Sequence, residues 1–333
     1  MTLVPLQAVA QEVGLRPFAA RQIADWLYRK NIRTLDDMSN LPAAARALLA
    51  EKYELGLLAP VREQVSRDGT KKYLYPAAGG RFIETAWIPD EERGTLCVST
   101  QVGCKMGCLF CQTARQGFQA QLTAGEIINQ LRSLPERDAV TNIVFMGMGE
   151  PLDNLSAVLD SVAILTADWG FAMSPRRISV STVGLLPALK DFLAKTECHL
   201  SVSLHSPFDE ERRRIMPIQH AQPLADVLQV IRKHAFRGQR RVFFEYILFK
   251  GINDTPRHVK ELVRILNGIT CRINLMRFHP VPDVPLQGSD EETIERFRQA
   301  LNDKGIVSTV RRSRGLDIAA ACGLLSTRAL VKP

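Results

Sequence analysis

From residue 96 onwards, short apolar runs alternate with stretches that carry apolar residues at helical spacing. Such a pattern predicts strands that alternate with helices. Strands are expected at 96–102, 142–149, 177–184, 199–206, 241–249 and 271–279, and the helices at 123–134, 153–168, 185–195, 223–236 and 255–267. Strand–helix alternation of this kind indicates an α/β fold with a parallel sheet. Six units form an open sheet or a partial barrel, because a closed barrel of this type needs eight.

The segments that flank this region follow other patterns. Helical spacing of apolar residues predicts a helix at 17–28, and Pro42 divides a helical pair over 34–53. A turn at Asp68-Gly69 separates short strand-like runs, the alternation over 81–88 predicts a strand, and a loop is expected to follow. The expected units are a helical accessory domain, a strand-rich connector, the barrel with its last helix at 289–303, and an extension with a strand-like run, at 1–58, 59–95, 96–305 and 306–333.

Composition limits the class of protein. Of the 333 residues, 46% are hydrophobic and 23% are charged, which excludes wholesale disorder. No apolar run approaches the ~18 residues that a membrane span needs. The first residues lack the pattern of a secretory signal, so we expect a cytoplasmic protein without a disulfide framework. The net charge of +8 is compatible with a nucleic-acid partner but does not establish one.

Three of the seven cysteines lie within eight residues, at Cys104, Cys108 and Cys111. This C-x3-C-x2-C spacing follows the first expected strand, and ligands of parallel α/β sheets bind at the carboxyl ends of the strands. A structural zinc site or a [4Fe–4S] cluster normally takes four protein ligands. Three thiolates therefore predict a cluster with one iron free to bind another molecule. The alternative is three unrelated thiols, which this crowding disfavours.

Five segments extend the pattern, and together they span nearly the whole chain. They read TLCVSTQVGC at 95–104, FMGMGEP at 145–151, RGLDIAAACG at 314–323, DGTKK at 68–72 and PFAARQIADWLY at 17–28. The chain resembles the RlmN/Cfr family of radical S-adenosylmethionine (SAM) enzymes, which methylate adenosine in RNA. The resemblance implies a radical SAM partial (βα)6 barrel, with a [4Fe–4S] cluster on Cys104, Cys108 and Cys111 and SAM on its free iron.

The resemblance also implies the chemistry. Adenine carbons 2 and 8 offer no lone pair to attack a methyl sulfonium, so a radical route is needed. Cys322 would take a methyl group from one SAM molecule and then form a transient covalent adduct with the RNA. Cys97 would release the product by forming a disulfide with Cys322, and Glu84 would accept the ring proton. Without the resemblance, Cys97 would be interpreted as a core thiol and Glu84 as a solvent-facing strand residue.

Residues at the other strand ends match positions that contact SAM in the family. They are Gly149, Glu150, Ser181, Ser203, Leu204, His205 and His279. Glycine allows close backbone approach, and a carboxylate can accept a hydrogen bond from the amino group of SAM. The last position departs from the family pattern: His279 stands where asparagine is expected, and Arg277 replaces a proline. Cys198 and Cys271 belong to no motif and are expected to be structural.

Two basic runs, at 232–241 and 311–314, suit contacts with RNA phosphates, although a charge run is more often a solvated face. The expected substrate is carbon 2 of adenosine in 23S rRNA and possibly tRNA, with residues 1–58 as the RNA-docking domain. Further expectations are a monomer, an electron donor such as flavodoxin or ferredoxin, and no membrane partner. Three alternatives stay open: methylation at carbon 8, a different RNA substrate, and a non-catalytic RNA-binding protein with a structural cluster.

Overall fold

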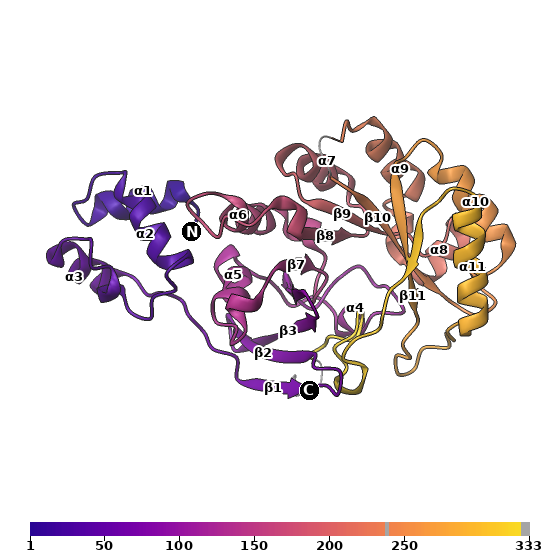
Figure 1. The fold of residues 1–333 in the computed structure, drawn as a ribbon, viewed down its shortest axis with the longest axis horizontal. Helices are drawn as coiled ribbons and strands as arrows, with labels where there is room; N and C mark the ends of the chain where they lie inside the picture. Colours follow the sequence, from indigo (N-terminus) through magenta and orange to yellow (C-terminus); the bar gives the residue numbers. More distant parts are fainter. Residues whose placement is uncertain (237–239, 328–333) are drawn as a thin grey trace.

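The computed structural model describes residues 1–236 and 240–327 and is organised around one ten-stranded sheet (Figure 1). The strand order is β1-β2-β3-β4-β7-β8-β9-β10-β11-β12. In this sheet β1 to β4 pair antiparallel, and the neighbouring strands from β4 and β7 onward to β12 pair parallel. The α/β partial barrel expected from the sequence is thus confirmed.

The strands are short and lie close to the expected positions. In the large sheet they are β1 Arg62–Val65, β2 Lys71–Ala77, β3 Arg81–Asp90, β4 Arg93–Cys97, β7 Asn142–Phe145, β8 Ile178–Thr182, β9 His199–Ser203, β10 Val242–Leu248, β11 Cys271–Arg277 and β12 Ser308–Val310. A small second sheet pairs β5 Gln101–Val102 with β6 Ala120–Gln121.

Helices connect the parallel strands and cover the sheet. The expected ones are α5 Ala124–Arg132, α6 Leu155–Thr166, α7 Leu186–Lys195, α9 Leu224–Lys233, α10 Pro256–Leu266 and α11 Glu291–Asp303. Two short helices were not predicted, α4 Gln112–Gln116 and α8 Asp209–Ile215. No helix of the described residues is both long and apolar enough to span a membrane.

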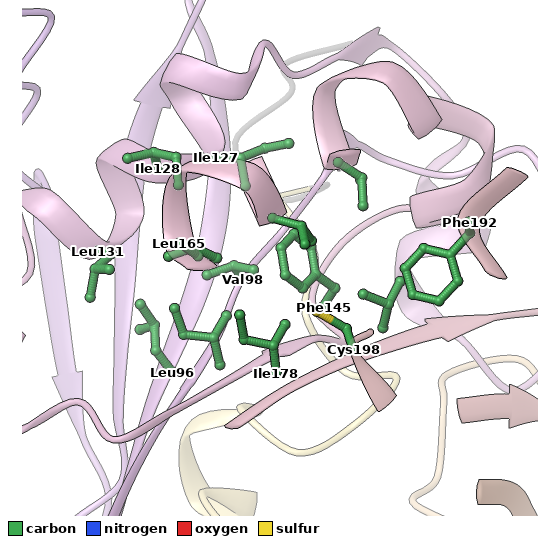
Figure 2. Packing of buried hydrophobic residues seen from close by; sticks show 14 of the residues in the cluster. Leu96, Val98, Ile127, Ile128, Leu131, Phe145, Leu165, Ile178, Phe192 and Cys198 are labelled. Atoms are coloured by element: carbon green, nitrogen blue, oxygen red, sulfur yellow. The ribbon is translucent and has the colours of Figure 1, made fainter. Parts of the chain in front are cut away.

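The core lies between the parallel strands and these helices. Figure 2 shows Leu96 of β4, Phe145 of β7 and Ile178 of β8 beside apolar side chains of α5 and α6. All three are almost completely buried. Burial of this apolar surface stabilises the fold by roughly 25 cal/mol per Å² removed from water. The same packing fixes the strand ends from which the loops of the candidate site begin.

The first 52 residues form a separate helical unit, with α1 Leu3–Glu12, α2 Ala19–Tyr28 and α3 Ala43–Lys52. It lies beside the α5/α6 side of the barrel, and an extended segment connects α3 to β1 (Figure 1). Tyr28 ends α2, and its ring lies 6.3 Å from that of Trp169 and 5.7 Å from that of Phe171. Arg137 donates a 2.6 Å hydrogen bond to the carbonyl of Tyr28. The unit therefore docks on the segment that follows α6.

The prediction of a loop at 89–94 is wrong. Asp90 pairs with Arg93, so β3 and β4 form a tight hairpin. Gly94 lies inside β4. The position needs glycine, because a Cβ there would sit 2.0 Å from the Trp87 ring and 2.2 Å from the carbonyl of Ala139. The glycine signals close packing and not a loop. The sheet also continues across the expected boundaries after residues 95 and 305, since β4 pairs with β3 and β12 with β11.

Candidate active site

A cavity of about 410 Å³ opens at the carboxyl ends of the parallel strands. The structure brings eleven of the candidate residues to its wall: Cys97, Cys104, Cys108, Cys111, Gly149, Glu150, Ser181, Ser203, His205, His279 and Cys322. Two candidates, Glu84 and Leu204, do not line it. The sequence segments that contribute are far apart, and the topology of the sheet joins them at one edge.

The loop after β5 carries the three closely spaced cysteines. Cys104 and Cys108 are buried and Cys111 is half-buried. Burial raises the pKa of Cys104 to about 12 and raises those of Cys108 and Cys111 as well. Protein contacts alone therefore hold these thiols neutral, and a metal centre would have to displace their protons.

The spacing of these thiols fits a cluster better than a single ion. Among the described residues, no group of three His, Cys, Asp or Glu side chains could hold one metal ion. A [4Fe–4S] cluster takes each thiolate on a different iron, so its ligands stand further apart than those of a mononuclear site. The apolar side chains of Met106 and Phe110 line the same cavity. A buried three-thiol loop of this kind has the donor set that such a cluster needs.

Gly149 and Glu150 follow β7, and Gly149 adopts a backbone conformation that favours glycine. Gly149 has φ +104°, and a Cβ there would lie 2.6 Å from the Cβ of Gln101. The Glu150 carboxylate accepts hydrogen bonds from the backbone N–H groups of Leu152 and Val183, each at 3.0 Å. Burial raises the pKa of Glu150 to about 7. The carboxylate thus connects the loops after β7 and β8 and can accept a further donor from the cavity.

His205 follows β9 in a left-handed conformation, with φ +56°. Its Nδ1 accepts from the N–H of Ile247 at 3.0 Å, and its carbonyl accepts from Asn253. Burial and the nearby Arg212 guanidinium lower the pKa of His205 to about 3. The imidazole is therefore neutral, and its Nε2 carries the remaining hydrogen.

Arg212 of α8 was missed by the sequence analysis. Its side chain is fully buried and donates to the carbonyls of Val183 at 3.2 Å, Ser203 at 3.0 Å and Leu204 at 3.1 Å. These carbonyls lie just after β8 and β9. The guanidinium thus holds together two loops of the site. Arg212 stands in the run DEERRR, which has the appearance of a solvated helix end, so no sequence signal marks it.

The departures at Arg277 and His279 have a structural basis. Arg277 makes two hydrogen bonds with the Glu291 carboxylate, at 2.5 and 2.6 Å, and a third with the carbonyl of Arg311 at 3.1 Å. This side chain therefore ties β11 to the start of α11 and to the segment after β12. His279 is half-buried, and burial together with Arg277 lowers its pKa. It meets the cavity as a neutral imidazole.

Cys97 and Cys322 approach the cavity from opposite parts of the chain. Cys97 ends β4 and is buried, whereas Cys322 is exposed. Burial, together with the nearby Cys322, raises the pKa of Cys97 to about 12. The Arg311 guanidinium lies 3.6 Å from the Glu245 carboxylate and acts in the opposite direction on Cys97. All seven cysteines are free in this structure.

The tail after Ala320 folds back onto α4, immediately after the cysteine loop (Figure 1). The N–H of Gln112 donates to the Gly323 carbonyl at 2.7 Å, and Thr113 Oγ1 donates to the Leu325 carbonyl at 2.6 Å. Gln116 Oε1 accepts from the N–H of Thr327 at 2.8 Å. These hydrogen bonds hold Cys322 at the cavity wall, and no pattern in the tail sequence predicted them.

Glu84 occupies a different position from either sequence interpretation. Its side chain is 10% exposed and does not face solvent, yet Glu84 does not line the cavity. One carboxylate oxygen is 2.9 Å from the Lys72 ammonium, and the other accepts from the N–H of Ser326 at 2.8 Å. Glu84 therefore anchors the tail in this structure.

The two basic runs differ in their surroundings. Arg311, Arg312 and Arg314 line the cavity. In the other run, Arg240 donates to the carbonyls of Leu193, Thr196 and Cys198, and the run ends where β10 begins, at the edge opposite the cavity. Arg237 lies outside the described residues. Arg240 of the run at 232–241 therefore has a structural role. Cys198 is completely buried, and neither it nor Cys271 lines the cavity.

Comparisons with known proteins agree with this arrangement. Residues 98–264 match the model of the radical SAM superfamily, and residues 1–55 match that of the ribosomal RNA large subunit methyltransferase N-terminal domain. A crystal structure of a radical SAM methyltransferase from Sphaerobacter thermophilus superposes with a TM-score of 0.91 at 40% identity and covers 98% of this chain and 97% of that one. The fold and the cysteine loop thus define a radical SAM enzyme, a class that uses a [4Fe–4S] cluster and SAM.

Curated relatives narrow the class. A probable dual-specificity RNA methyltransferase RlmN from Parabacteroides distasonis is 55% identical over 98% of this chain and 95% of its own length. The dual-specificity RNA methyltransferase RlmN of Syntrophus aciditrophicus is 41% identical over 99% and 96%. The chain belongs to the RlmN family of radical SAM RNA methyltransferases.

Proposed function

We propose that this protein methylates carbon 2 of adenosine in both 23S rRNA and tRNA. The observation that carries the proposal is one cavity lined by the three-cysteine loop, Cys97 and Cys322 together. A scaffold with a structural cluster needs neither of the last two thiols. The relatives named dual-specificity RNA methyltransferases support the two RNA classes. The bound cluster and SAM supply the radical chemistry, and the protein supplies the thiols, the proton acceptor and the binding surface.

In this proposal Cys322 carries the methyl group to the adenine. Its exposure leaves the sulfur accessible, and the Arg311 guanidinium is near enough to interact electrostatically with it. Cys97 then attacks the Cys322 sulfur, so that an S–S bond forms while the bond from that sulfur to the methylene carbon of the adduct breaks. The carbon leaves with the electron pair, takes up the proton of the Cys97 thiol and becomes the methyl group of the product, and the two sulfurs remain as a transient disulfide. Cys97 is well placed to wait in its neutral form, because burial holds its pKa at about 12.

We propose Glu84 as the acceptor of the ring proton. Its carboxylate is engaged by Lys72 and by the N–H of Ser326, so the tail must move before Glu84 can reach the substrate. The same movement would carry Cys322, four residues earlier in the chain. Release of the tail and exposure of the base are therefore one event in this scheme.

RNA would approach the open side of the cavity. Arg312 is exposed at this wall and suits a phosphate contact. We propose residues 1–58 as the docking unit for the remainder of the RNA, and residues 59–95, 96–305 and 306–333 as the connector, barrel and extension that serve it. The proposed reductant is a one-electron donor such as flavodoxin or ferredoxin, and the proposed state is a monomer.

Three cysteine variants test the mechanism in anaerobically reconstituted protein supplied with unmodified rRNA and tRNA. Cys322→Ala should yield no product, whereas Cys97→Ala should accumulate a protein–RNA crosslink. Cys198→Ala is the matched control, because this buried thiol lies outside the cavity. Normal turnover by either of the first two variants would refute the two-thiol mechanism.

Mass spectrometry of the digested RNA decides the position. The proposal expects 2-methyladenosine in both substrates. A methyl group at carbon 8 would contradict it and would favour the Cfr-like alternative, which the curated relatives do not support. Methylation of only one RNA class would restrict the proposal to that class.

A further inference from the structure

Arg311 follows β12, the last strand of the sheet, and its side chain connects two walls of the cavity. Its Nη1 lies 3.6 Å from Glu245 Oε2 and 3.5 Å from the Met146 sulfur. Glu245 belongs to β10 and Met146 follows β7, so two other strands of the sheet separate the two contacts. All three residues line the cavity that also contains Cys97 and Cys322.

Glu245 fixes the position of this guanidinium. Its residue is 4% exposed, and its Oε1 accepts hydrogen bonds from Ser201 Oγ at 2.5 Å and from Asn274 Nδ2 at 2.9 Å. Within the part of the chain that the structure describes, Oε2 has no hydrogen-bond partner, so Arg311 is its counter-charge. Because a buried carboxylate without an opposite charge is costly, the pair holds the guanidinium in place.

The Arg311 charge acts on the Cys97 sulfur. Met146 links the two residues, since its backbone N–H donates to the Cys97 sulfur while its side-chain sulfur contacts Arg311. Among the described residues, the ionisable groups that act on the Cys97 thiol are Arg311 and Cys322. Burial raises the pKa of Cys97 to about 12, and the guanidinium opposes this rise.

The last step of the proposed mechanism needs such a charge. When Cys97 attacks the Cys322 sulfur, its thiol gives up a proton and negative charge develops on a buried atom. Cys97 packs against Ala86 and Ala320, and apolar surroundings of this kind oppose an anion. A cation that is already in position stabilises the developing charge without reorganisation.

We propose that Arg311 stabilises the negative charge on the Cys97 sulfur as the disulfide forms, and that Glu245 positions the guanidinium for this step. The S–S bond forms, the bond from the Cys322 sulfur to the methylene carbon breaks, and the proton of Cys97 passes to that carbon. Arg311 stays protonated throughout. The inference rests on the proposed two-thiol mechanism and adds the charge that releases the product.

The lifetime of the protein–RNA crosslink tests this role in a single turnover of the full-length, cluster-loaded protein. In Arg311→Met the crosslink should persist at least about tenfold longer than in the wild type, because an opposite charge nearby shifts a pKa by about 1–3 units. Arg311→Lys keeps the cation and should restore most of the decay rate. Structural damage would slow formation of the crosslink and lower its amount, whereas loss of the charge raises its amount. A wild-type lifetime in Arg311→Met would overturn the proposal.

A double variant separates the charge from the folding of the site. Arg311→Met leaves the Glu245 carboxylate unpaired, whereas Arg311→Met/Glu245→Gln removes both charges and keeps an oxygen that can accept from Ser201 and Asn274. The double variant should show the same long-lived crosslink. Rapid decay of the crosslink in this variant would overturn the proposal even if the single variant does not fold.

Arg312→Met is the matched control, since Arg312 lines the same cavity but does not act on the Cys97 pKa. It should weaken RNA binding and leave the crosslink lifetime at the wild-type value. An equal lengthening would show a general charge effect and overturn the assignment to Arg311. Cys97→Ala identifies the level of a failure. If it forms no crosslink, the two-thiol mechanism itself is refuted. If it does and Arg311→Met decays normally, only the role of Arg311 is refuted.

Discussion

Removal of the Gln116 side chain should uncouple the tail from the cysteine loop. Gln116 makes three hydrogen bonds to the tail: Oε1 accepts from Ser326 Oγ at 3.0 Å and from the Thr327 N–H at 2.8 Å, and Nε2 donates to Thr327 Oγ1 at 2.8 Å. Because each hydrogen bond contributes about 1 kcal/mol, Gln116→Ala weakens docking of the tail by about 3 kcal/mol. Since about 1.4 kcal/mol is a factor of ten, the docked population relative to the free tail falls about 100-fold.

Cys322 takes up the methyl group at the cavity while the tail is docked, before the release that exposes Glu84. We therefore expect the methylation rate of Gln116→Ala to fall by one to two orders of magnitude while the iron and sulfide content stays unchanged. The assay is single-turnover methylation of an RNA fragment, with iron analysis on the same samples. Gln116→Glu is the matched control, because it keeps the Oε1 acceptor and replaces the Nε2 donor with a second acceptor oxygen, toward which Thr327 can turn its hydroxyl to donate. A wild-type rate in Gln116→Ala would refute the idea that this side chain holds Cys322 in place.

Other perturbations have equally specific outcomes. Lys72→Met leaves the Glu84 carboxylate buried without its partner and should destabilise the protein by about 3–5 kcal/mol in denaturant unfolding, with the double variant Lys72→Met/Glu84→Gln recovering much of the loss. Equal losses in the single and double variants would contradict the idea that the unpaired Glu84 carboxylate causes the loss. Burial raises the Glu150 pKa to about 7, so its carboxylate is neutral below that pH, and SAM affinity should fall by up to about tenfold per pH unit as pH drops from 7. Glu150→Gln should lose this slope in equilibrium binding. Gly149→Ala forces a Cβ to 2.6 Å from that of Gln101 and should weaken SAM binding by about 5- to 150-fold, which corresponds to about 1–3 kcal/mol of strain; normal affinity would show that the loop relaxes.

The repeating part of the fold could be predicted because its elements follow simple periodicities. Strand ends were predicted well enough to gather most of the cavity wall, since the carboxyl ends of parallel strands must share one edge. The hairpin at Asp90 and Arg93 could not be predicted in the same way. The residues around Gly94 are typical of a loop, and only the approach of the Trp87 ring shows why the position needs glycine.

The residues that position the site were harder to predict from the sequence. Arg212 and Arg240 both stand in charged runs, yet each uses its guanidinium to bind several backbone carbonyls. Whether an arginine faces solvent or fills such a cage depends on tertiary contacts that no local pattern encodes. Gln116 likewise acquires its role only through a segment more than two hundred residues later in the chain. The periodicity of apolar residues along a sequence does not predict long-range pairing of this kind.

The bond between Thr113 and the Leu325 carbonyl joins residues that are 212 positions apart. During translation the cysteine loop therefore leaves the ribosome long before the tail that will cover it. At about 5–20 residues per second, the delay is roughly 10–40 s. Throughout this interval the growing chain displays the three cysteines without the tail. The iron–sulfur centre can therefore assemble in the open cysteine loop before the tail segment that covers it has been synthesised.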